Sequence, residues 1–237
     1  MIAFNNFEEQ YISIRRRENR LYNDEQVKWL PNIHPSHPHY KEWLIREHSA
    51  NKLIQYLAGK RKVLNILEVG CGNGWLAAQF SKISGSNVAG IDINQIELAQ
   101  AKRVFDHIEN VEFINCEITD APICVEKFDV IIFAASVQYF SSLHKIIEQA
   151  LRLLVPGGEI HIIDSFFYKA TELEAARKRS AEYYDLLHSS EMAKHYFHHD
   201  IDELKSFKFK IFYNPDQIIN RFLKNKKPFH WICIYNG

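Results

Sequence analysis

The sequence has no excess of charge of either sign, since 29 lysines and arginines balance 29 aspartates and glutamates. A protein without a net positive field does not gather phosphate backbones or anionic lipid, so nucleic acid and membranes are disfavoured as partners. Long hydrophobic runs are absent as well. The apolar stretch at 130–137 falls well short of the roughly 20 residues that a membrane-spanning helix needs.

Cysteine is scarce and scattered. The four cysteines are Cys71, Cys116, Cys124 and Cys233. They form no C-x-x-C pair, which argues against a disulfide framework or a zinc ribbon and favours reduced thiols. The N-terminus lacks the basic start and continuous apolar segment of a secretion signal, so the expected location is the cytoplasm. With 237 residues, 46% of them hydrophobic, the chain is long enough for one α/β domain with additions.

Strand-like and helix-like segments alternate from about residue 61 onward, which is typical of a parallel sheet with crossover helices. Near-continuous apolar character in the first and fourth strand-like segments predicts central strands that are covered on both faces. Asn94 can cap one crossover helix, with Glu97 three residues on, and another helix begins after Ser142. The predicted strands are 63–69, 87–92, 111–115, 128–134, 159–164, 208–213 and 229–235.

The two flanks of this core have a different character. Residues 1–60 are predicted to form a mostly helical extension that caps the main domain at 61–237. The segment at 165–206, with a helix predicted from 171 to 188, is longer than a crossover connection needs, so we expect a helical, lid-like insertion. The proline- and histidine-rich stretch at 31–39 is expected to be a turn-rich connector.

The first strand runs directly into a loop of alternating glycines, Gly70-Cys71-Gly72-Asn73-Gly74, and a helix follows at Trp75. Glycines let the backbone turn sharply and approach a ligand closely, and the following helix offers unpaired N–H groups. Eighteen residues beyond the last glycine, Asp92 ends the second strand at the same edge of the sheet, where a carboxylate can accept both hydroxyl protons of a ribose. The sequence therefore predicts a nucleotide-like site.

The pattern Glu68-x-Gly70-x-Gly72-x-Gly74 resembles the first motif of the class I S-adenosylmethionine-dependent methyltransferases, and the resemblance extends over about 61–165. It implies a seven-stranded, mainly parallel Rossmann-like sheet whose last strand is antiparallel. It also implies S-adenosylmethionine as the cofactor and S-adenosylhomocysteine as the product. Glu117 departs from the pattern, because many members have aspartate at that position.

The resemblance further implies roles for single residues. Glu68 holds the amino group of the methionine part, directly or through water, and the loop backbone flanks that part. Asp92 binds the ribose, and Ile93 lies against the adenine. Glu117 meets the adenine amino group and the Ile118 backbone its ring, while the Ala134 carbonyl faces the ammonium. The whole predicted cofactor-binding set is Glu68, Gly70, Cys71, Gly72, Gly74, Trp75, Asp92, Ile93, Glu117, Ile118 and Ala134.

Two other functions compete with this interpretation. Gly72-x-Gly74-x-x-Ala77 also fits a permissive dinucleotide fingerprint, which would make the protein an NAD(P)-dependent oxidoreductase. Against it, Glu68 is an unfavourable charge beside an anionic pyrophosphate but a favourable one beside a cationic methyl donor. The second alternative is a module that binds S-adenosylmethionine without catalysing a reaction.

Methyl transfer requires alignment of donor and acceptor and exclusion of water, so no fixed catalytic residue follows from the chemistry. The reacting face of a parallel sheet lies at the carboxyl ends of its strands, which selects Gln138, Tyr139, Asp164 and Tyr168 as candidates for substrate contact. Each of them has the alternative of bonding the backbone or capping a helix. The candidate catalytic residues are His198, His199, Tyr139 and Asp164.

Two clusters have plainer interpretations. His195, His198 and His199 lack a cysteine or carboxylate that would complete a ligand set, so no metal site is predicted. The arginines at 15–17 and 20 are expected to form a solvated or salt-bridged helix face rather than an RNA-binding patch. The fourth strand also lacks the motifs of nucleic-acid methylases. A small-molecule methyl acceptor is therefore expected, bound by a monomer or a homodimer.

Overall fold

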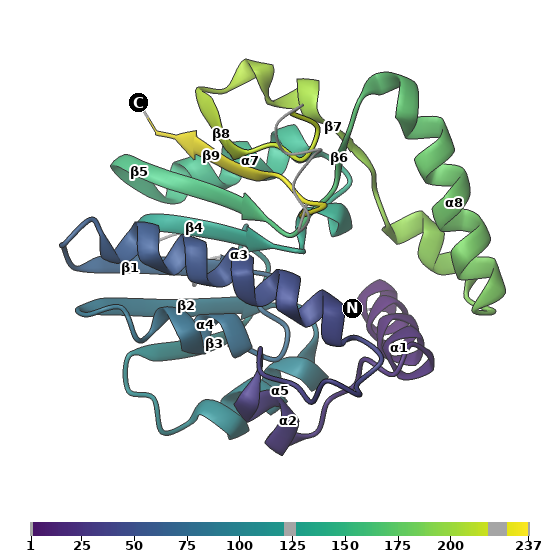
Figure 1. The fold of residues 1–237 in the computed structure, drawn as a ribbon, viewed down its shortest axis with the longest axis horizontal. Helices are drawn as coiled ribbons and strands as arrows, with labels where there is room; N and C mark the ends of the chain where they lie inside the picture. The colour runs from purple at the N-terminus through teal and green to yellow at the C-terminus, as the bar shows by residue number, and fades with distance from the viewer. Residues whose placement is uncertain (1, 121–126, 218–226, 237) are drawn as a thin grey trace.

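The computed structural model describes residues 2–120, 127–217 and 227–236. A seven-stranded sheet in the order β3-β2-β1-β4-β5-β9-β8 forms its centre (Figure 1). Strands β1 to β5 run parallel, whereas β9 is antiparallel to both β5 and β8. The predicted sheet, with its antiparallel last strand, is confirmed. The strands are β1 Leu64–Val69, β2 Ser86–Asp92, β3 Val111–Asn115, β4 Phe128–Ala134, β5 Leu154–Ile163, β8 Phe209–Tyr213 and β9 Trp231–Tyr235.

The helices cover both faces of the sheet (Figure 1). The α-helices of the described residues are α1 Ile2–Arg17, α2 Asp24–Trp29, α3 Tyr40–Ala58, α4 Trp75–Phe80, α5 Gln95–Phe105, α7 Leu143–Leu153 and α8 Leu173–Leu186, of which α1 and α8 lie beyond one edge of the sheet. Side chains alternate across a strand, so Ile66 of β1 joins one buried cluster, with α3, α4 and α5, while its neighbour Leu67 joins another, with α7. The predicted central strands are therefore covered on both sides.

Two helix starts follow the expected side-chain chemistry. The Asn94 side chain accepts a hydrogen bond from the backbone N–H of Glu97 at 3.0 Å, and Ser142 accepts one from Lys145 at 3.3 Å. Each cap satisfies an N–H group that the helix itself leaves without a partner. The second helix ends at Leu153, and β5 begins at once, earlier than the predicted residue 159.

The N-terminal segment and the segment after β5 meet beyond the carboxyl ends of the parallel strands, where Figure 1 shows α1 beside α8. Ile14 of α1, Tyr184 of α8 and Met192 form a small buried cluster there. Met192 belongs to the 3-10 helix η3, Ser190–His195, which is followed by the two-residue strand β7, His199–Asp200. Two segments distant in sequence thus cover one edge of the sheet.

Two further expectations concern cysteine and membranes. Within the described residues, Cys71, Cys116 and Cys233 are buried and form no disulfide, while Cys124 lies outside those residues. Among the helices that the structure describes, none combines the length and the hydrophobicity of a membrane span.

Gly74→Ala is expected to lower the free energy of unfolding by roughly 3 kcal/mol, because the position combines left-handed strain with overpacking. Its φ is +75°, and an added Cβ would lie 2.5 Å from the Phe113 ring. Gly157→Ala is the matched control, with a φ of +74° and open space around the Cβ, and should cost only about 1 kcal/mol. Urea unfolding of both variants checks the difference, and equal losses would contradict a packing role for Gly74.

Candidate active site

The glycine loop after β1 is held in an unusual backbone conformation. Gly70, Gly72 and Gly74 all have positive φ, at 76°, 52° and 75°. The N–H groups of Gly70 and Cys71 both donate to the carbonyl of Ile91 in β2, at 2.9 and 3.0 Å. A Cβ at Gly70 would lie 2.7 Å from the Cβ of Ser136, so glycine alone fits this close approach.

Asp92 ties the loop to the next helix. Its Oδ2 accepts a hydrogen bond from Gly72 N–H at 2.7 Å, and its Oδ1 accepts one from Asn94 N–H at 2.8 Å. Burial raises the pKa of Asp92, and these backbone N–H groups oppose that shift. Each carboxylate oxygen keeps a lone pair for a ligand hydroxyl, which is the role that the sequence predicts.

Glu68 is a buried acid beside the glycine loop. Its carboxyl is 3% exposed, and Oε2 has no hydrogen-bond partner among the residues that the structure describes. Burial raises its pKa well above the ordinary value, a hydrogen bond from the Ala77 backbone lowers it, and Asp92 raises it further. A buried acceptor without a partner is costly, so this atom fits a cationic or hydrogen-bond-donating ligand such as an ammonium group.

Two adjoining cavities lie over this edge of the sheet. The larger has a volume of about 650 Å³, and its lining includes the predicted residues Gly70, Gly72, Asp92, Ile93, Glu117 and Ile118. The smaller, of about 100 Å³, is lined by Glu68, Gly70, Cys71, Gly72, Trp75 and Ala134 from the same prediction. The structure thus brings together the residues that the family resemblance selects, except Gly74. That glycine is in neither lining and instead packs beneath Phe113.

The predicted substrate contacts divide into two groups. Tyr139 lines the larger cavity. Gln138, Asp164 and Tyr168 line neither cavity. Gln138 donates to the Ala135 carbonyl at 2.5 Å and accepts from Ser165 at 3.3 Å, so both ends of its amide are satisfied inside the protein.

The remaining two candidates are held away from the cavities. Asp164 is buried, and burial raises its pKa to about 6 while the nearby Arg46 and Ser49 lower it. Tyr168 lies against the imidazole of His198, with ring centroids 5.4 Å apart. Asp164 therefore belongs to the protein interior and Tyr168 is half-buried against His198, and their predicted contact with substrate has no support from the cavity linings.

The three histidines His195, His198 and His199 have different surroundings, because the backbone conformation changes between them. His195 lines the larger cavity at the end of η3. His198 pairs with Ser180 of α8 at 2.9 Å, and His199 Nε2 lies 2.9 Å from the Val137 carbonyl. Because the segment leaves its 3-10 helix before these two residues, it does not present one helical face. The cavity therefore receives His195, where the sequence analysis favoured His198 and His199.

The sequence analysis missed the contribution of the N-terminal extension. Arg15 and Arg20 are salt-bridged, to Glu18 at 3.2 Å and to Glu42 at 2.6 Å, as predicted, but both line the smaller cavity instead of facing solvent. Arg15 also lies over the Tyr11 ring, 4.8 Å from its centroid. The four-residue spacing of this tyrosine and arginine was the available signal, since it places both on one helix face.

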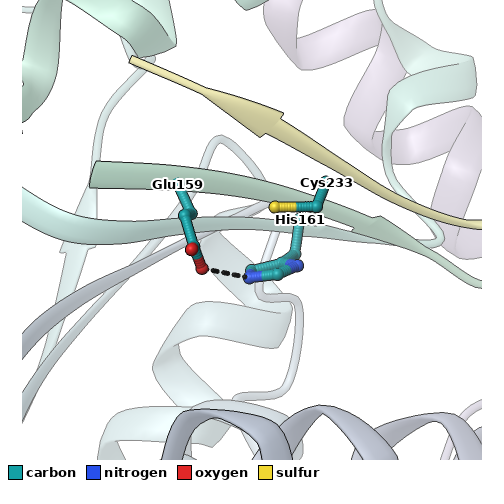
Figure 2. Close-up of side chains that lie close together, drawn as sticks. All are labelled: Glu159, His161 and Cys233. Carbon is teal, nitrogen blue, oxygen red and sulfur yellow. Dashed lines mark hydrogen bonds and ion pairs between the residues drawn. The ribbon is translucent and has the colours of Figure 1, made fainter. Parts of the chain in front are cut away.

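One further cluster could be taken for a metal site. Among the described residues, Glu159, His161 and Cys233 bring ligand atoms within 4.8 Å of one another, on β5 and β9 (Figure 2). The Trp231 indole, which can only donate, gives a hydrogen bond to His161 Nδ1 at 3.2 Å. The neutral ring therefore carries its proton on Nε2 and donates it to Glu159 at 3.2 Å. A metal on Nε2 would force a proton onto Nδ1, against the indole N–H.

The other groups in this cluster also favour protons over a metal ion. Lys60 donates to Glu159 at 2.8 Å, and Tyr56 donates to the same carboxylate at 3.1 Å. Burial raises the pKa of the Cys233 thiol to about 12, so it is not a thiolate near neutral pH. The cluster is best interpreted as a hydrogen-bonded network that joins α3 to β5 and β9.

Glu159→Gln is expected to lower the free energy of unfolding by about 2 kcal/mol, because Lys60 and His161 lose a charged acceptor in a buried place. The matched control is Glu148→Gln, whose partner His144 forms an exposed pair at 3.4 Å and whose loss should cost less than about 0.5 kcal/mol. Denaturant unfolding measures both variants. Added zinc should leave the Tm unchanged, and a rise in Tm that Cys233→Ser abolishes would instead establish a metal site.

The fold and the cavity chemistry define a Rossmann-like protein with a site for a cationic, adenosyl-type ligand. The chain belongs to the methyltransferase family whose model, described as a methyltransferase domain, matches residues 60–236. The predicted resemblance to class I S-adenosylmethionine-dependent methyltransferases is confirmed, and so is the class of cofactor that this resemblance implied.

Curated relatives match through part of their length. The chain is 31% identical over 137 residues to malonyl-[acyl-carrier protein] O-methyltransferase 2 of Ilyobacter polytropus, covering 57% of this chain and 52% of the relative. It is 33% identical over 116 residues to demethylmenaquinone methyltransferase of Chlorobaculum tepidum, covering 49% of this chain and 46% of the relative. The chain thus spans about half the length of these curated relatives.

Solved structures share the fold over the whole chain. The crystal structure of magnesium protoporphyrin IX methyltransferase from Synechocystis, with bound SAH, has a TM-score of 0.63 at 12% identity and covers 100% of this chain and 98% of that one. The plantazolicin methyltransferase BpumL, in complex with SAH, has a TM-score of 0.58 at 16% identity, covering 99% of this chain and 98% of that one. At these identities the likeness concerns the fold.

Proposed function

We propose that this protein transfers a methyl group from S-adenosylmethionine to a small-molecule acceptor. The observation that carries the proposal is Glu68, a buried carboxylate with an unpartnered oxygen beside a glycine loop that leads to Asp92. An ammonium of a methionine moiety would stabilise the ionised form of this buried acid, whereas a pyrophosphate would oppose its ionisation and gain no charge pairing from it. The dinucleotide alternative is therefore disfavoured.

The two cavities match the two halves of the methyl donor. An amino acid needs both an acid and a base for recognition, and the smaller cavity offers Glu68 for the ammonium and Arg20 and Arg46 for the carboxylate. The larger cavity offers Asp92 for the ribose, with Ile93 and Ile118 as apolar surfaces for the adenine. The predicted role of Glu117 in contacting the adenine amino group remains part of this proposal.

The bound donor would supply an electrophilic methyl group, and the protein would do the rest of the work. The glycine loop and Asp92 orient the donor, because a displacement requires the acceptor atom, the methyl carbon and the sulfur to be in line. The rings of Tyr11 and Tyr139, which lie 5.8 Å apart and line the larger cavity, would shield the bound donor from water. The acceptor would supply the attacking lone pair, the C–S bond would break to leave the neutral thioether, and a hydroxyl acceptor would give its proton to solvent, so the protein needs no nucleophilic residue of its own.

The acceptor side is formed by segments outside the sheet. Phe7, Tyr139, Phe140 and His195 line the larger cavity beyond the donor-binding residues. A volume of about 650 Å³ with aromatic walls falls within the range of about 300–1,000 Å³ that is common for small-molecule sites. The curated relative named for demethylmenaquinone supports an acceptor of this size class, whereas the relative named for malonyl-[acyl-carrier protein] has an acceptor attached to a carrier protein.

In this proposal residues 1–60 act as a cap and 165–206 as a lid, and together they enclose the acceptor. The contact between α1 and η3 supports this arrangement, since Phe7 and His195 line the larger cavity from the two segments. We propose a cytoplasmic enzyme that functions as a monomer or homodimer, without nucleic acid or membrane as its substrate. The balanced charge of the chain supports the last point.

Calorimetry tests the donor assignment. S-adenosylmethionine and S-adenosylhomocysteine should both bind, whereas NADH should not. Asp92→Asn should weaken both affinities by about tenfold or more, because an amide cannot accept from the loop N–H and both ribose hydroxyls as a carboxylate does. Asp106→Asn, at the exposed end of α5, is the control and should leave both affinities unchanged. Tight NADH binding without binding of either sulfur compound would refute the proposed function.

Turnover tests the catalytic part of the proposal. The protein with labelled S-adenosylmethionine should methylate at least one member of a panel of phenols, quinols and carboxylic acids. Tyr139→Phe should reduce that turnover by about tenfold, because Tyr139 lines the larger cavity and its hydroxyl accepts a hydrogen bond from Arg15 at 3.3 Å. Tyr213→Phe, whose hydroxyl bonds the Lys227 backbone away from both cavities, serves as the control. Tight donor binding with no methylated product would favour a non-catalytic binding module.

A further inference from the structure

Glu97 lies where the two cavities meet. It stands in the first turn of α5, beside the glycine loop, and its Oε2 is 3.2 Å from the position that a Cβ on Gly72 would take. Only a few residues line both cavities: Tyr11, Gly70, Gly72, Glu97 and Ala135. Within the described residues, Tyr11 and Glu97 are the members of this set with polar side chains.

This inference rests on the proposed function, under which the junction of the two cavities corresponds to one atom of the methyl donor. In S-adenosylmethionine the sulfur is the atom that joins the methionine part to the adenosyl part. With the methionine part in the smaller cavity and the adenosyl part in the larger, the sulfur belongs at the junction. That sulfur is a cationic sulfonium in the donor and a neutral thioether in the product, while the ammonium and the carboxylate are common to both.

We propose that Glu97 distinguishes the methyl donor from its demethylated product by the charge on the sulfur. The ionised carboxylate attracts the sulfonium and gains nothing from the thioether, so the site holds the donor more tightly and lets the product leave. Glu97 is in this sense a specificity-determining residue. It acts on binding, not on the transfer step itself.

The surroundings of Glu97 allow its charge to respond to the ligand. Burial raises its pKa to about 7, the negative charge of Asp92 on β2 raises it as well, and Arg15 and Tyr11 of α1 lower it. The thiol of Cys71, which burial keeps protonated, also lies within electrostatic reach. Glu97 is therefore partly protonated near neutral pH, and an arriving cation shifts it to the ionised form.

The sign of the pH dependence follows from this. Because a sulfonium favours the carboxylate, donor binding lowers the pKa of Glu97 and releases a proton when the pH is at or below about 7. The ratio of donor affinity to product affinity should therefore rise as the pH increases to about 7 and then level off. Glu68 faces the ammonium that donor and product share, so its contribution cancels in the comparison of the two ligands.

A structural role for Glu97 makes a different prediction. Tyr11 donates a hydrogen bond to Glu97, and Arg15 lies within its electrostatic reach, so the acid could simply anchor α1 over the loop. Loss of an anchor would weaken the binding of donor and product by the same factor. The ratio of the two affinities thus separates charge recognition from anchoring.

Calorimetric titration of Glu97→Gln with S-adenosylmethionine and S-adenosylhomocysteine tests the proposal. The glutamine keeps the size and a hydrogen-bond acceptor but removes the charge, so donor affinity should fall by about tenfold while product affinity changes by less than about twofold. Titrations in two buffers of different ionisation enthalpy should show that the wild type at pH 6.5 releases more protons on binding the donor than on binding the product, and that this difference is lost in the variant. Glu18→Gln, which removes the other acid beside Arg15 outside both cavities, should leave the affinity ratio unchanged.

Each outcome decides the proposal. If Glu97→Gln leaves the ratio of donor affinity to product affinity unchanged, because both affinities fall by the same factor or neither falls, charge recognition is overturned and the anchoring role remains. If the variant does not fold, the wild-type titrations still decide, because equal proton release by donor and product would overturn the proposal. Failure of both ligands to bind the wild type would instead refute the proposed function.

Discussion

The geometry of the donor-binding site depends on one carboxylate that accepts hydrogen bonds from two separate segments of backbone. Asp92 accepts from Gly72 in the loop after β1 and from Asn94 at the start of α5. These two bonds hold the loop at its positive φ angles and set α5 against it, which brings Glu97 over the loop. Both donors are backbone N–H groups. The positions of these N–H groups relative to Asp92 are therefore set by the parallel pairing of β1 with β2, and less by the neighbouring side chains.

The same edge of the sheet concentrates acidic groups that are buried or half-buried. Burial raises the pKa values of Glu68, Asp92 and Glu97, so full ionisation of all three carboxyl groups together is disfavoured. A cationic ligand relieves this cost, whereas an anionic one adds to it. The preference for a sulfonium compound over a pyrophosphate is in this way built into the folded protein. Arg15 of α1 supplies the local counter-charge and couples the N-terminal extension to the site.

Much of the fold was predictable because its signals are local. The strands β3 and β4 agree with the predicted bounds, and the cap at Asn94 forms as expected, since alternation, apolar runs and capping act over a few residues. The positions of the histidines were harder to predict from the sequence. His195 reaches the cavity and His199 bonds the Val137 carbonyl because η3 ends between them, and no local pattern marks that change of backbone.

The sequence by itself determined the class of sheet, the glycine loop and the acid at the end of β2, because these follow from residue spacing along a continuous strand–turn–helix unit. Only the tertiary structure decided which side chains of the flanks complete the site. Arg15 and Tyr11 precede the loop by more than 50 residues, and they meet it because α1 packs against η3 and α5. Whether a salt-bridged helix face lies in solvent or lines a cavity depends on packing between segments that are distant in sequence. The residue spacing within one segment therefore does not predict it.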